Sequence, residues 1–380
     1  MDSHERKNRG YTTRSTHTLN YPDFVTANAD AFLRSRHIGF EMLAALAREQ
    51  GFDDAQVLLT SSPVHGIATA TSDIDLICVT PQAVSKGQMA TQIHRDGQHC
   101  EILPIGTDDL ARAFADLALL SGRALPQRLA GYQRWDSGHA VRKKYLERIV
   151  YAVATDGRAH HLAHLPALVP VAAAQEYDAF HQSRVCAVLA ERAGEPEAAR
   201  GYLINACLSA MAAALSLGGW VLSNKKWTLR RWREAAGPRM NNVVDPLLQD
   251  RLTAMWSSVC EPAPANTARE IAALDDIDQR LGTLMGAPSL SNAMPHTAAP
   301  GTQAALDKRS AFLIGDDGRA RLAATTGAQD PPSDLAGLAS IASAHAASLL
   351  RGARSGTLSF SLVAASSPVE EKEDAHALAD

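Results

Sequence analysis

The chain has 380 residues, 46% of them hydrophobic, which is enough for one or two buried cores at roughly 150 residues per domain. Its formal net charge of −4 gives no overall electrostatic attraction to nucleic acid or anionic lipid, so a polyanion would have to bind locally. The 5 cysteines include no CxxC pair, which argues against a disulfide framework or a structural zinc site and favours a reducing compartment.

The first part of the chain combines helix and strand patterns. Residues 1–22 are polar and lack the apolar core of a secretory signal, so we expect a mobile N-terminal arm and a cytoplasmic protein. Residues 23–107 are expected to form a small α/β unit. Its amphipathic helix is predicted over residues 23–50 and ends at Gly51. Its strands are predicted in three apolar runs, residues 57–59, 73–79 and 100–105.

Residues 108–288 are rich in alanine and leucine, which predicts a second, α-helical domain. Within it, residues 202–222 carry no charged side chain and are long enough to span a bilayer. Alanine rather than leucine dominates this run, and Asn205, Ser209 and Ser216 interrupt it, so its transfer into lipid would gain little. A buried core helix is therefore the preferred interpretation, and no membrane association is expected.

The last part of the chain changes in composition. Residues 289–305 are rich in Ser, Thr, Pro and Ala and predict a linker. Residues 306–366 would form a small appended α/β domain, with a hairpin turn at residues 316–318 and a helix over residues 333–350. The acidic residues 367–380 contain no aromatic side chain and are expected to be disordered.

The most specific pattern is a pair of aspartates at the start of the second predicted strand. Residues two apart in a strand face the same side, so Asp73 and Asp75 present their carboxylates together while Ile74 points into the core. Such oxygens suit Mg²⁺, which also takes ligands from substrate phosphates. Glu101, in the third predicted strand, would let two Mg²⁺ ions clamp an in-line displacement, or would accept the proton of the attacking hydroxyl. The simpler alternative is that all three are solvated strand residues.

A turn upstream of the aspartates has the residues of a phosphate site. Ser61 and Ser62 would aim backbone N–H groups and a hydroxyl outward, a geometry that holds phosphate. Gly66 would let a phosphate approach the backbone closely. His65 lies in the same turn, and contact with a triphosphate and a bystander role are equally consistent with the sequence.

Residues 61–75 resemble the signature of the DNA polymerase β-like nucleotidyltransferase superfamily. In that signature a Gly-Ser pair and a later glycine precede a Ser-Asp-hydrophobic-Asp strand. Ser62 matches the serine, Gly66 the later glycine, and Ser72 opens the carboxylate strand. Ser61 stands where the first glycine is usual.

The resemblance covers residues 23–106, and Glu101 matches the third acidic position by its apolar flanks. It implies a small mixed sheet with helices on one side. It also implies an enzyme that transfers a nucleoside monophosphate from a nucleoside triphosphate to a hydroxyl and releases pyrophosphate.

A basic stretch with two tryptophans, residues 223–233, lies in the helical part. It is similar to an Asn-x-Lys-Trp stretch in helical domains attached to some small-molecule nucleotidyltransferases, which implies that Lys226 and Arg230 reach the triphosphate. The alternative is an ordinary helix whose cations face water while its tryptophans pack. Residues 142–144 form a second basic group, which is interpreted as a solvated helical face.

These patterns predict an α+β protein with a small mixed-sheet nucleotidyltransferase domain followed by an α-helical substrate domain. ATP is the expected nucleotide. The expected acceptor is a small molecule, because the acidic chain lacks an aromatic, basic strand surface for reading RNA. An RNA 3′ end or a protein hydroxyl is the alternative acceptor. From another functional class, the alternative is a catalytically lapsed binding or regulatory module, marked by Ser61.

Overall fold

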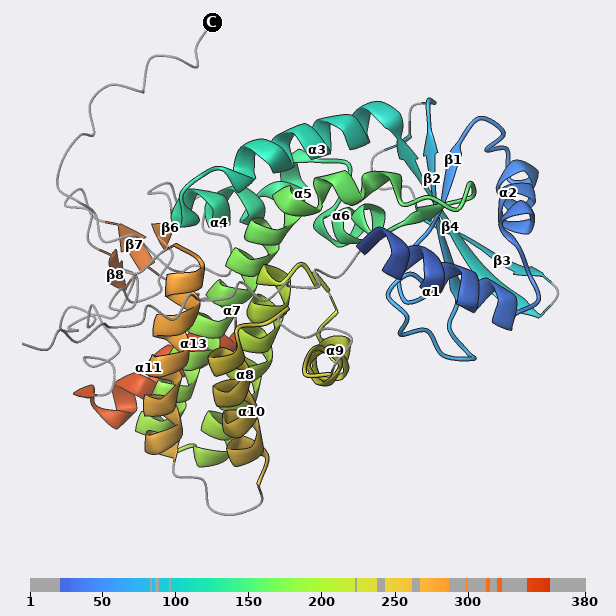
Figure 1. The fold of residues 1–380 in the computed structure, drawn as a ribbon. Coiled ribbons are helices and arrows are strands. Elements are labelled where there is room, and N and C mark those ends of the chain that lie inside the picture. The colour runs from blue at the N-terminus through green and yellow to red at the C-terminus, as the bar shows by residue number, and fades with distance from the viewer. Residues whose placement is uncertain are drawn as a thin grey trace, which may run out of the picture.

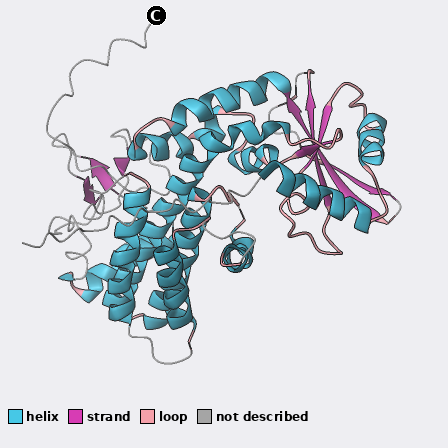
Figure 2. Ribbon diagram, in the orientation of Figure 1, coloured by secondary structure: helices cyan, strands magenta, loops and turns pink. Residues whose placement is uncertain are grey.

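The computed structural model describes residues 21–82, 84–85, 89–95, 97–222, 224–237, 243–261, 267–286 and 340–355, with three short strands within residues 298–322. The predicted acidic tail and most of the predicted N-terminal arm and linker lie outside the described residues. A sheet lies at one end of the molecule and long helices lie at the other (Figures 1 and 2), which confirms the predicted α+β class.

Five strands form the main sheet. They are β1 (Gln56–Leu59), β2 (Ile74–Thr80), β3 (Thr91–Arg95), β4 (Gln98–Gly106) and β5 (Val153–Ala154). Their order is β3-β4-β2-β1-β5, with β2 and β4 parallel and the other neighbours antiparallel. β2 and β4 are almost continuously buried, as expected for strands covered on both faces. The three predicted strands correspond to β1, β2 and β4.

Helices make up most of the remaining described residues. Those up to residue 164 are α1 (Tyr21–Ser35), α2 (Phe40–Glu49), α3 (Thr107–Ser121), α4 (Leu125–Gln133), α5 (Trp135–Gly138), α6 (Lys143–Val150) and the 3₁₀ helix η1 (His160–His164). The later ones are α7 (Leu165–Ala193), α8 (Pro196–Leu217), the 3₁₀ helix η2 (Lys225–Trp227), α9 (Thr228–Ala235), α10 (Pro246–Cys260), α11 (Thr267–Leu284) and α13 (Ser343–Ser355).

The single helix predicted over residues 23–50 is wrong, because the structure has two helices there, α1 and α2. His37 adopts a left-handed conformation with φ 57°, and the Ile38 N–H donates to the Leu33 carbonyl, which closes the end of α1. Glycine is the usual residue for this ending. Because His37 stands there instead, the sequence carries no glycine to mark the end of α1. The apolar spacing also continues into α2, so the break is not visible in the sequence.

The core around the sheet includes side chains from beyond residue 107. Leu110 and Phe114 of α3 and Leu146 and Ile149 of α6 are buried in one cluster with the strands. β5 also comes from this later part of the chain and pairs with β1. Residues on both sides of position 107 therefore build the sheet and its cover, and the predicted domain limits stay predictions.

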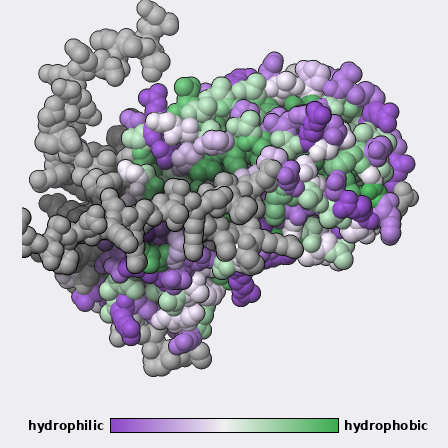
Figure 3. All heavy atoms as spheres, in the orientation of Figure 1, coloured by the Kyte–Doolittle hydropathy of each residue, from purple (hydrophilic) through white to green (hydrophobic). Residues whose placement is uncertain are grey.

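α8 is the one helix in the described part of the chain that is long and apolar enough to cross a membrane. The protein buries 61% of its most apolar window. Its buried residues share a core with α7, α10 and α11, as predicted for a core helix. On the face in Figure 3, hydrophobic and hydrophilic residues are interspersed. The exposed large hydrophobic residues are likewise scattered over separate elements, at Met89, Leu119, Leu247 and Leu284.

The C-terminal helix α13 packs on the long helices. Its Leu349 and Leu350 are buried against α7 residues such as Val185 and Leu189. Further back, β7 (Phe312–Ile314) pairs antiparallel with β8 (Ala320–Leu322), as the predicted hairpin requires, and in parallel with β6 (Ala298–Ala299). The predicted hairpin turn lies outside the described residues.

A buried charged cluster joins α7 to α11. Asp278, 1% exposed, accepts a hydrogen bond from the Tyr177 hydroxyl at 2.6 Å and pairs with Arg184 at 2.8 Å and His181 at 2.9 Å. Burial by itself would raise the pKa of Asp278, but its contacts with His181, Arg184 and Tyr177 hold that pKa below its usual range. The carboxylate thus contacts three buried side chains of the neighbouring helix and accepts well-aligned hydrogen bonds from Tyr177 and Arg184.

Asp278→Ala is expected to lower the free energy of unfolding by about 3–5 kcal/mol, because it removes the buried counter-charge of Arg184 and leaves that arginine only its contact with the largely exposed Asp275. Asp276 offers a matched control on the same helix. It is mostly exposed and pairs with Arg251 at 2.7 Å, so Asp276→Ala should cost less than about 1 kcal/mol. Urea denaturation measures both values. Equal losses would contradict the structural role of Asp278.

Candidate active site

A cavity of about 400 Å³ lies between the sheet and the segment before α9. The predicted site residues that line it are Ser61, Ser62, His65, Ser72, Asp73, Asp75 and Lys226. They come from three separate stretches of sequence: the turn after β1, the start of β2 and η2. The structure therefore brings together most of the residues that the sequence singled out. Gly66, Glu101 and Arg230 lie beside the cavity residues, as described below.

The carboxylates meet at β2 and β4. Asp75 lies directly opposite Glu101 in the parallel pairing of these strands, and residues opposite each other share a face. Burial raises the pKa of Glu101, and the negative charge of Asp75 and a hydrogen bond with it raise that pKa further. Arg148 and Lys144 act in the opposite direction. The two carboxyl groups thus form a pair that is stabilised by a shared proton or by a cation.

Asp73 is engaged differently. Its Oδ1 lies 2.9 Å from Nδ1 of His99, and its side chain is 54% exposed. Among the residues that the structure describes, no three His, Cys, Asp or Glu side chains form a ready metal cluster. The Asp75–Glu101 pair nevertheless fits one Mg²⁺, because a cation bound to these two hard oxygen donors would take the place of the proton that the raised pKa of Glu101 favours. A second ion would require Asp73 to leave His99.

The loop of residues 61–72 begins with a strained turn. Ser61 has φ 65°, the left-handed conformation that glycine adopts without steric cost. The turn is closed by hydrogen bonds from the Gly66 N–H to the Pro63 carbonyl and from the Ile67 N–H to the Ser62 carbonyl. Within the described part of the chain, the Ser61 and Ser62 N–H groups make no hydrogen bond. These two donors thus stay available at the cavity.

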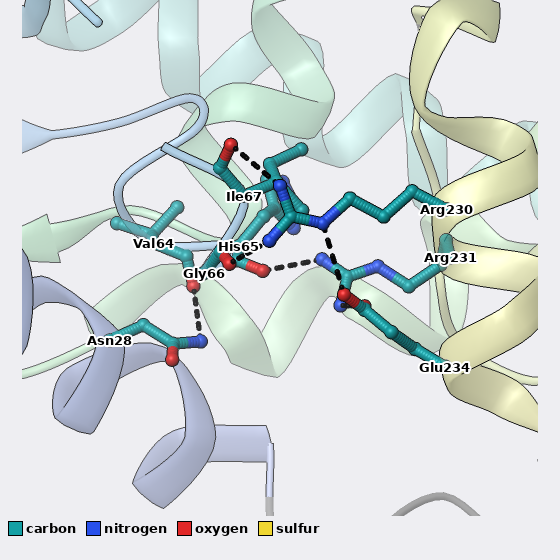
Figure 4. A network of polar contacts seen from close by, with 8 residues as sticks. All are labelled: Asn28, Val64, His65, Gly66, Ile67, Arg230, Arg231 and Glu234. Atoms are coloured by element: carbon teal, nitrogen blue, oxygen red, sulfur yellow. Dashed lines mark hydrogen bonds and ion pairs between the residues drawn. The ribbon is translucent and has the colours of Figure 1, made fainter. Parts of the chain in front are cut away.

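Gly66 is required at its position by the fold. It has φ 66°, and a Cβ atom there would lie 2.8 Å from the Asn28 side chain. Asn28 itself donates to the Val64 carbonyl at 3.2 Å (Figure 4). The sequence predicted that this glycine lets a phosphate approach the backbone. In the structure, close packing against Asn28 explains why residue 66 is a glycine. The phosphate contact stays a prediction.

Two arginines from α9 hold the loop from the helical side (Figure 4). Arg230 donates to the carbonyl oxygens of Gly66 and Ile67 at 3.2 and 3.3 Å. Arg231 donates to the carbonyl oxygen of His65 and pairs with Glu234 at 2.7 Å. Arg230 was expected to reach a triphosphate, and it lies instead against loop carbonyls. Any role at the triphosphate stays a prediction.

A third arginine holds the other end of the loop. Arg36, which follows α1, donates to the carbonyl oxygens of Thr69 and Ala70 at 3.3 and 3.1 Å and also to that of Ser72. Ser72 in turn accepts a hydrogen bond from the Thr69 N–H at 2.8 Å. The loop carbonyls are thus turned toward cations, so its shape is fixed from outside the cavity.

His65 is 2% exposed and borders the cavity. Its Nε2 atom lies 3.2 Å from Oε1 of Glu147, although neither ring nitrogen makes a well-aligned hydrogen bond in the described part of the chain. Its ring also lies 4.7 Å from that of Tyr151. His65 therefore connects the loop to α6, and its contact with a triphosphate stays a prediction.

Sequence reasoning missed part of the cavity wall. Glu147 and Arg148 of α6 line it, beside Asn224 and Trp227 from the basic stretch that the sequence had singled out. The Tyr151 hydroxyl accepts from the Val221 N–H at 3.0 Å and donates to the Gly219 carbonyl, which anchors the segment that leads to η2. Only the basic cluster at the start of α6 pointed to this helix in the sequence, and nothing local indicated the tyrosine.

Comparison with known proteins gives a limited match. A stretch of 107 residues is 31% identical to adenylosuccinate synthetase of Polaromonas naphthalenivorans (strain CJ2). The stretch covers 27% of this chain and 22% of the relative, so the chain spans about a fifth of the length of the curated relative that it matches. A family of unknown function, DUF6001, matches residues 21–365, which is most of the 380-residue chain, and the chain therefore belongs to this family.

Proposed function

We propose that this protein is a magnesium-dependent nucleotidyltransferase of the DNA polymerase β-like type. The observation that carries the proposal is the convergence on one cavity of the two serines after β1, the two aspartates at β2 and Lys226. These residues are more than 150 positions apart at the extremes. Phosphate-binding donors, hard metal ligands and a cation in one cavity are what a nucleoside triphosphate requires.

Each side chain has a role that its position supports. Ser61 and Ser62 donate N–H groups and hydroxyls to the phosphates, and Lys226 neutralises their charge. Asp75 and Glu101 hold Mg²⁺, with Asp73 as a further ligand when it leaves His99. Bound there, Mg²⁺ would stabilise charge on the transferred phosphoryl group and its leaving pyrophosphate.

The reaction would join the acceptor oxygen to the α-phosphorus and release pyrophosphate. The bond between the α-phosphorus and the bridging oxygen breaks, and the acceptor loses its hydroxyl proton. Glu101, whose pKa is raised by burial and by Asp75, is suited to take that proton when it is not a metal ligand.

A small-molecule acceptor is supported by a second cavity next to the carboxylates. This cavity measures about 450 Å³, a volume in the range typical of small-molecule sites. Glu101 lines it together with Arg142, Lys144 and Tyr145. Asp75 faces the first cavity and Glu101 the second, so the carboxyl pair stands between a donor site and an acceptor site. The proposed donor nucleotide is ATP.

A catalytically lapsed module is the second candidate, because two observations favour it. Asp73 is paired with His99 rather than with the other carboxylates, and Ser61 brings a side chain into a backbone conformation suited to glycine. A lapsed member would bind nucleotide without turning it over. The experiment below distinguishes the two candidates.

Asp73→Asn combined with Asp75→Asn is expected to reduce magnesium-dependent pyrophosphate release by about 100-fold or more, the scale of losing a main electrostatic stabiliser. Release is measured with each of the four nucleoside triphosphates and a panel of small hydroxyl acceptors, RNA 3′ ends and proteins. Asp250→Asn, an exposed change on α10, is the matched control and should retain wild-type release.

Binding of the magnesium nucleotide is followed in parallel by thermal shift. At a ligand concentration of 100 Kd the stabilisation should be about 2.7 kcal/mol. Wild-type protein that binds nucleotide but releases no pyrophosphate with any acceptor would support the lapsed module. Absence of both binding and release would refute the proposed function.

Glu101→Gln is expected to raise the melting temperature at neutral pH when no divalent cation is present. The folded pKa of Glu101 lies above its unfolded value, so ionisation disfavours the folded state as pH rises through that window, and glutamine removes this penalty. At about pH 4, where both states are mostly protonated, the difference should shrink.

The same variant should lose the stabilisation that Mg²⁺ gives to the wild-type protein. Melting curves at both pH values, with and without Mg²⁺, measure the two effects. A Glu101→Gln protein that is less stable than wild type at neutral pH would show that the carboxyl pair is a structural contact.

A further inference from the structure

The candidate cavity has apolar lining residues among its polar ones. The apolar residues that line it are Ile67, Leu222 and Trp227, and the other lining residues are polar or charged. Ile67 is 1% exposed and the other two are partly buried. Apolar side chains do not bind a triphosphate or a metal ion. A nucleotide does carry a flat, largely apolar part, which is its base.

Trp227 is held beside the phosphate loop. The Arg230 guanidinium lies 5.8 Å from the indole centroid and donates to the Ile67 carbonyl at 3.3 Å, so one side chain connects the indole to the loop. The Lys226 ammonium lies 5.0 Å from the same centroid. The side chain expected to meet phosphates is therefore next to the indole.

The short helix that carries Trp227 is anchored to its surroundings. Asn224 caps it by accepting from the Lys226 N–H at 3.1 Å. Lys225 donates to the Ser209 hydroxyl at 2.7 Å and pairs with Glu176 at 3.3 Å, which attaches η2 to α8 and α7. The indole position is thus set by these contacts, since the ring itself is only partly buried.

The other tryptophans have core or framework positions. Trp135, Trp220 and Trp232 are buried, and the indoles of Trp135 and Trp232 donate to the Val141 carbonyl and the Thr253 hydroxyl. Trp256 packs at the edge of the helical core. Trp227 is the tryptophan that lines the candidate cavity.

We propose that Trp227 is a stacking platform for the base of the bound nucleotide and that it favours purines. This inference rests on the proposed function, and it adds the side of the cavity that the base occupies. A base stacked on the indole would be flanked by Ile67 and Leu222, while its phosphates extend toward Ser61 and Ser62. A purine covers more of an indole than a pyrimidine does, so ATP and GTP should bind more tightly than CTP and UTP.

The test separates base contacts from phosphate contacts. Binding of Mg²⁺ complexes of ATP, GTP, CTP, UTP and inorganic tripolyphosphate is measured by calorimetry for wild type, Trp227→Phe, Trp227→Leu and the control Trp256→Leu. Trp227→Leu should weaken ATP binding by about 5- to 100-fold, the range that stacking on an aromatic residue gives. Tripolyphosphate binding should change less than about twofold, because that ligand has no base.

Further readouts fix the role of the ring. Trp227→Phe should bind ATP with intermediate affinity, and the preference for purines should disappear in Trp227→Leu. Nucleotide-induced quenching of tryptophan emission should be lost in Trp227→Phe and kept in Trp256→Leu. Melting temperatures of all variants confirm that each protein is folded.

Each outcome decides the proposal. Equal losses for ATP and tripolyphosphate in Trp227→Leu would mean that the indole only shapes the phosphate loop, and would overturn it. Unchanged ATP affinity would also overturn it and leave the proposed function standing. Wild-type protein that binds tripolyphosphate as tightly as every nucleotide would refute a base site. Wild-type protein that binds none of the five ligands would refute the base site and the proposed function together.

Discussion

Asp75 and Glu101 are like charges that the parallel pairing of β2 and β4 holds opposite each other. A pair of carboxyl groups in this position destabilises the sheet unless a proton or a cation lies between them, and burial together with the charge of Asp75 raises the pKa of Glu101. Arg148 and Lys144 offset part of it from outside the strands. An arrangement that opposes folding but is retained at a cavity is typical of a site kept for its chemistry.

The loop that faces these carboxyl groups depends on cations rather than on regular hydrogen bonding. Arg36 holds its far end, and Arg230 and Arg231 hold the part around Gly66. Charged donors make stronger hydrogen bonds to carbonyl oxygens than neutral donors do. Because the carbonyls are occupied in this way, the Ser61 and Ser62 N–H groups can be directed to the cavity, and the left-handed Ser61 is held in place by the surrounding contacts.

The sequence predicted the α+β class, the strands β1, β2 and β4, the core helix α8 and most of the residues that meet in the cavity. It succeeded where the signal is local, as in the two-residue spacing of Asp73 and Asp75. It missed β3 because residues 91–95 are mostly polar and exposed, and β5 because two residues carry no periodic pattern. The contributions of Tyr151 and Arg231 could not be predicted, since they arise from contacts between residues about 70 and 166 positions apart.

Arg231 connects α9 to the loop of residues 61–72 and so fixes their relative position. Arg231 is 1% exposed, and its guanidinium lies 4.4 Å from the Trp220 ring centroid and reaches the His65 carbonyl. Burial lowers the pKa of this arginine, and Glu234, the indole and the carbonyl compensate its charge in place of water.

A buried cation with three fixed partners tolerates little displacement, because moving α9 away from the loop would leave that charge without compensation. Lys226 and Trp227 directly precede α9, so their distance from Ser61 and Asp75 is set by the same contacts. The cavity is therefore largely preformed. A ligand that contacts both walls would lose little free energy in ordering them, which favours tight recognition of a small, rigid molecule over capture of an extended one.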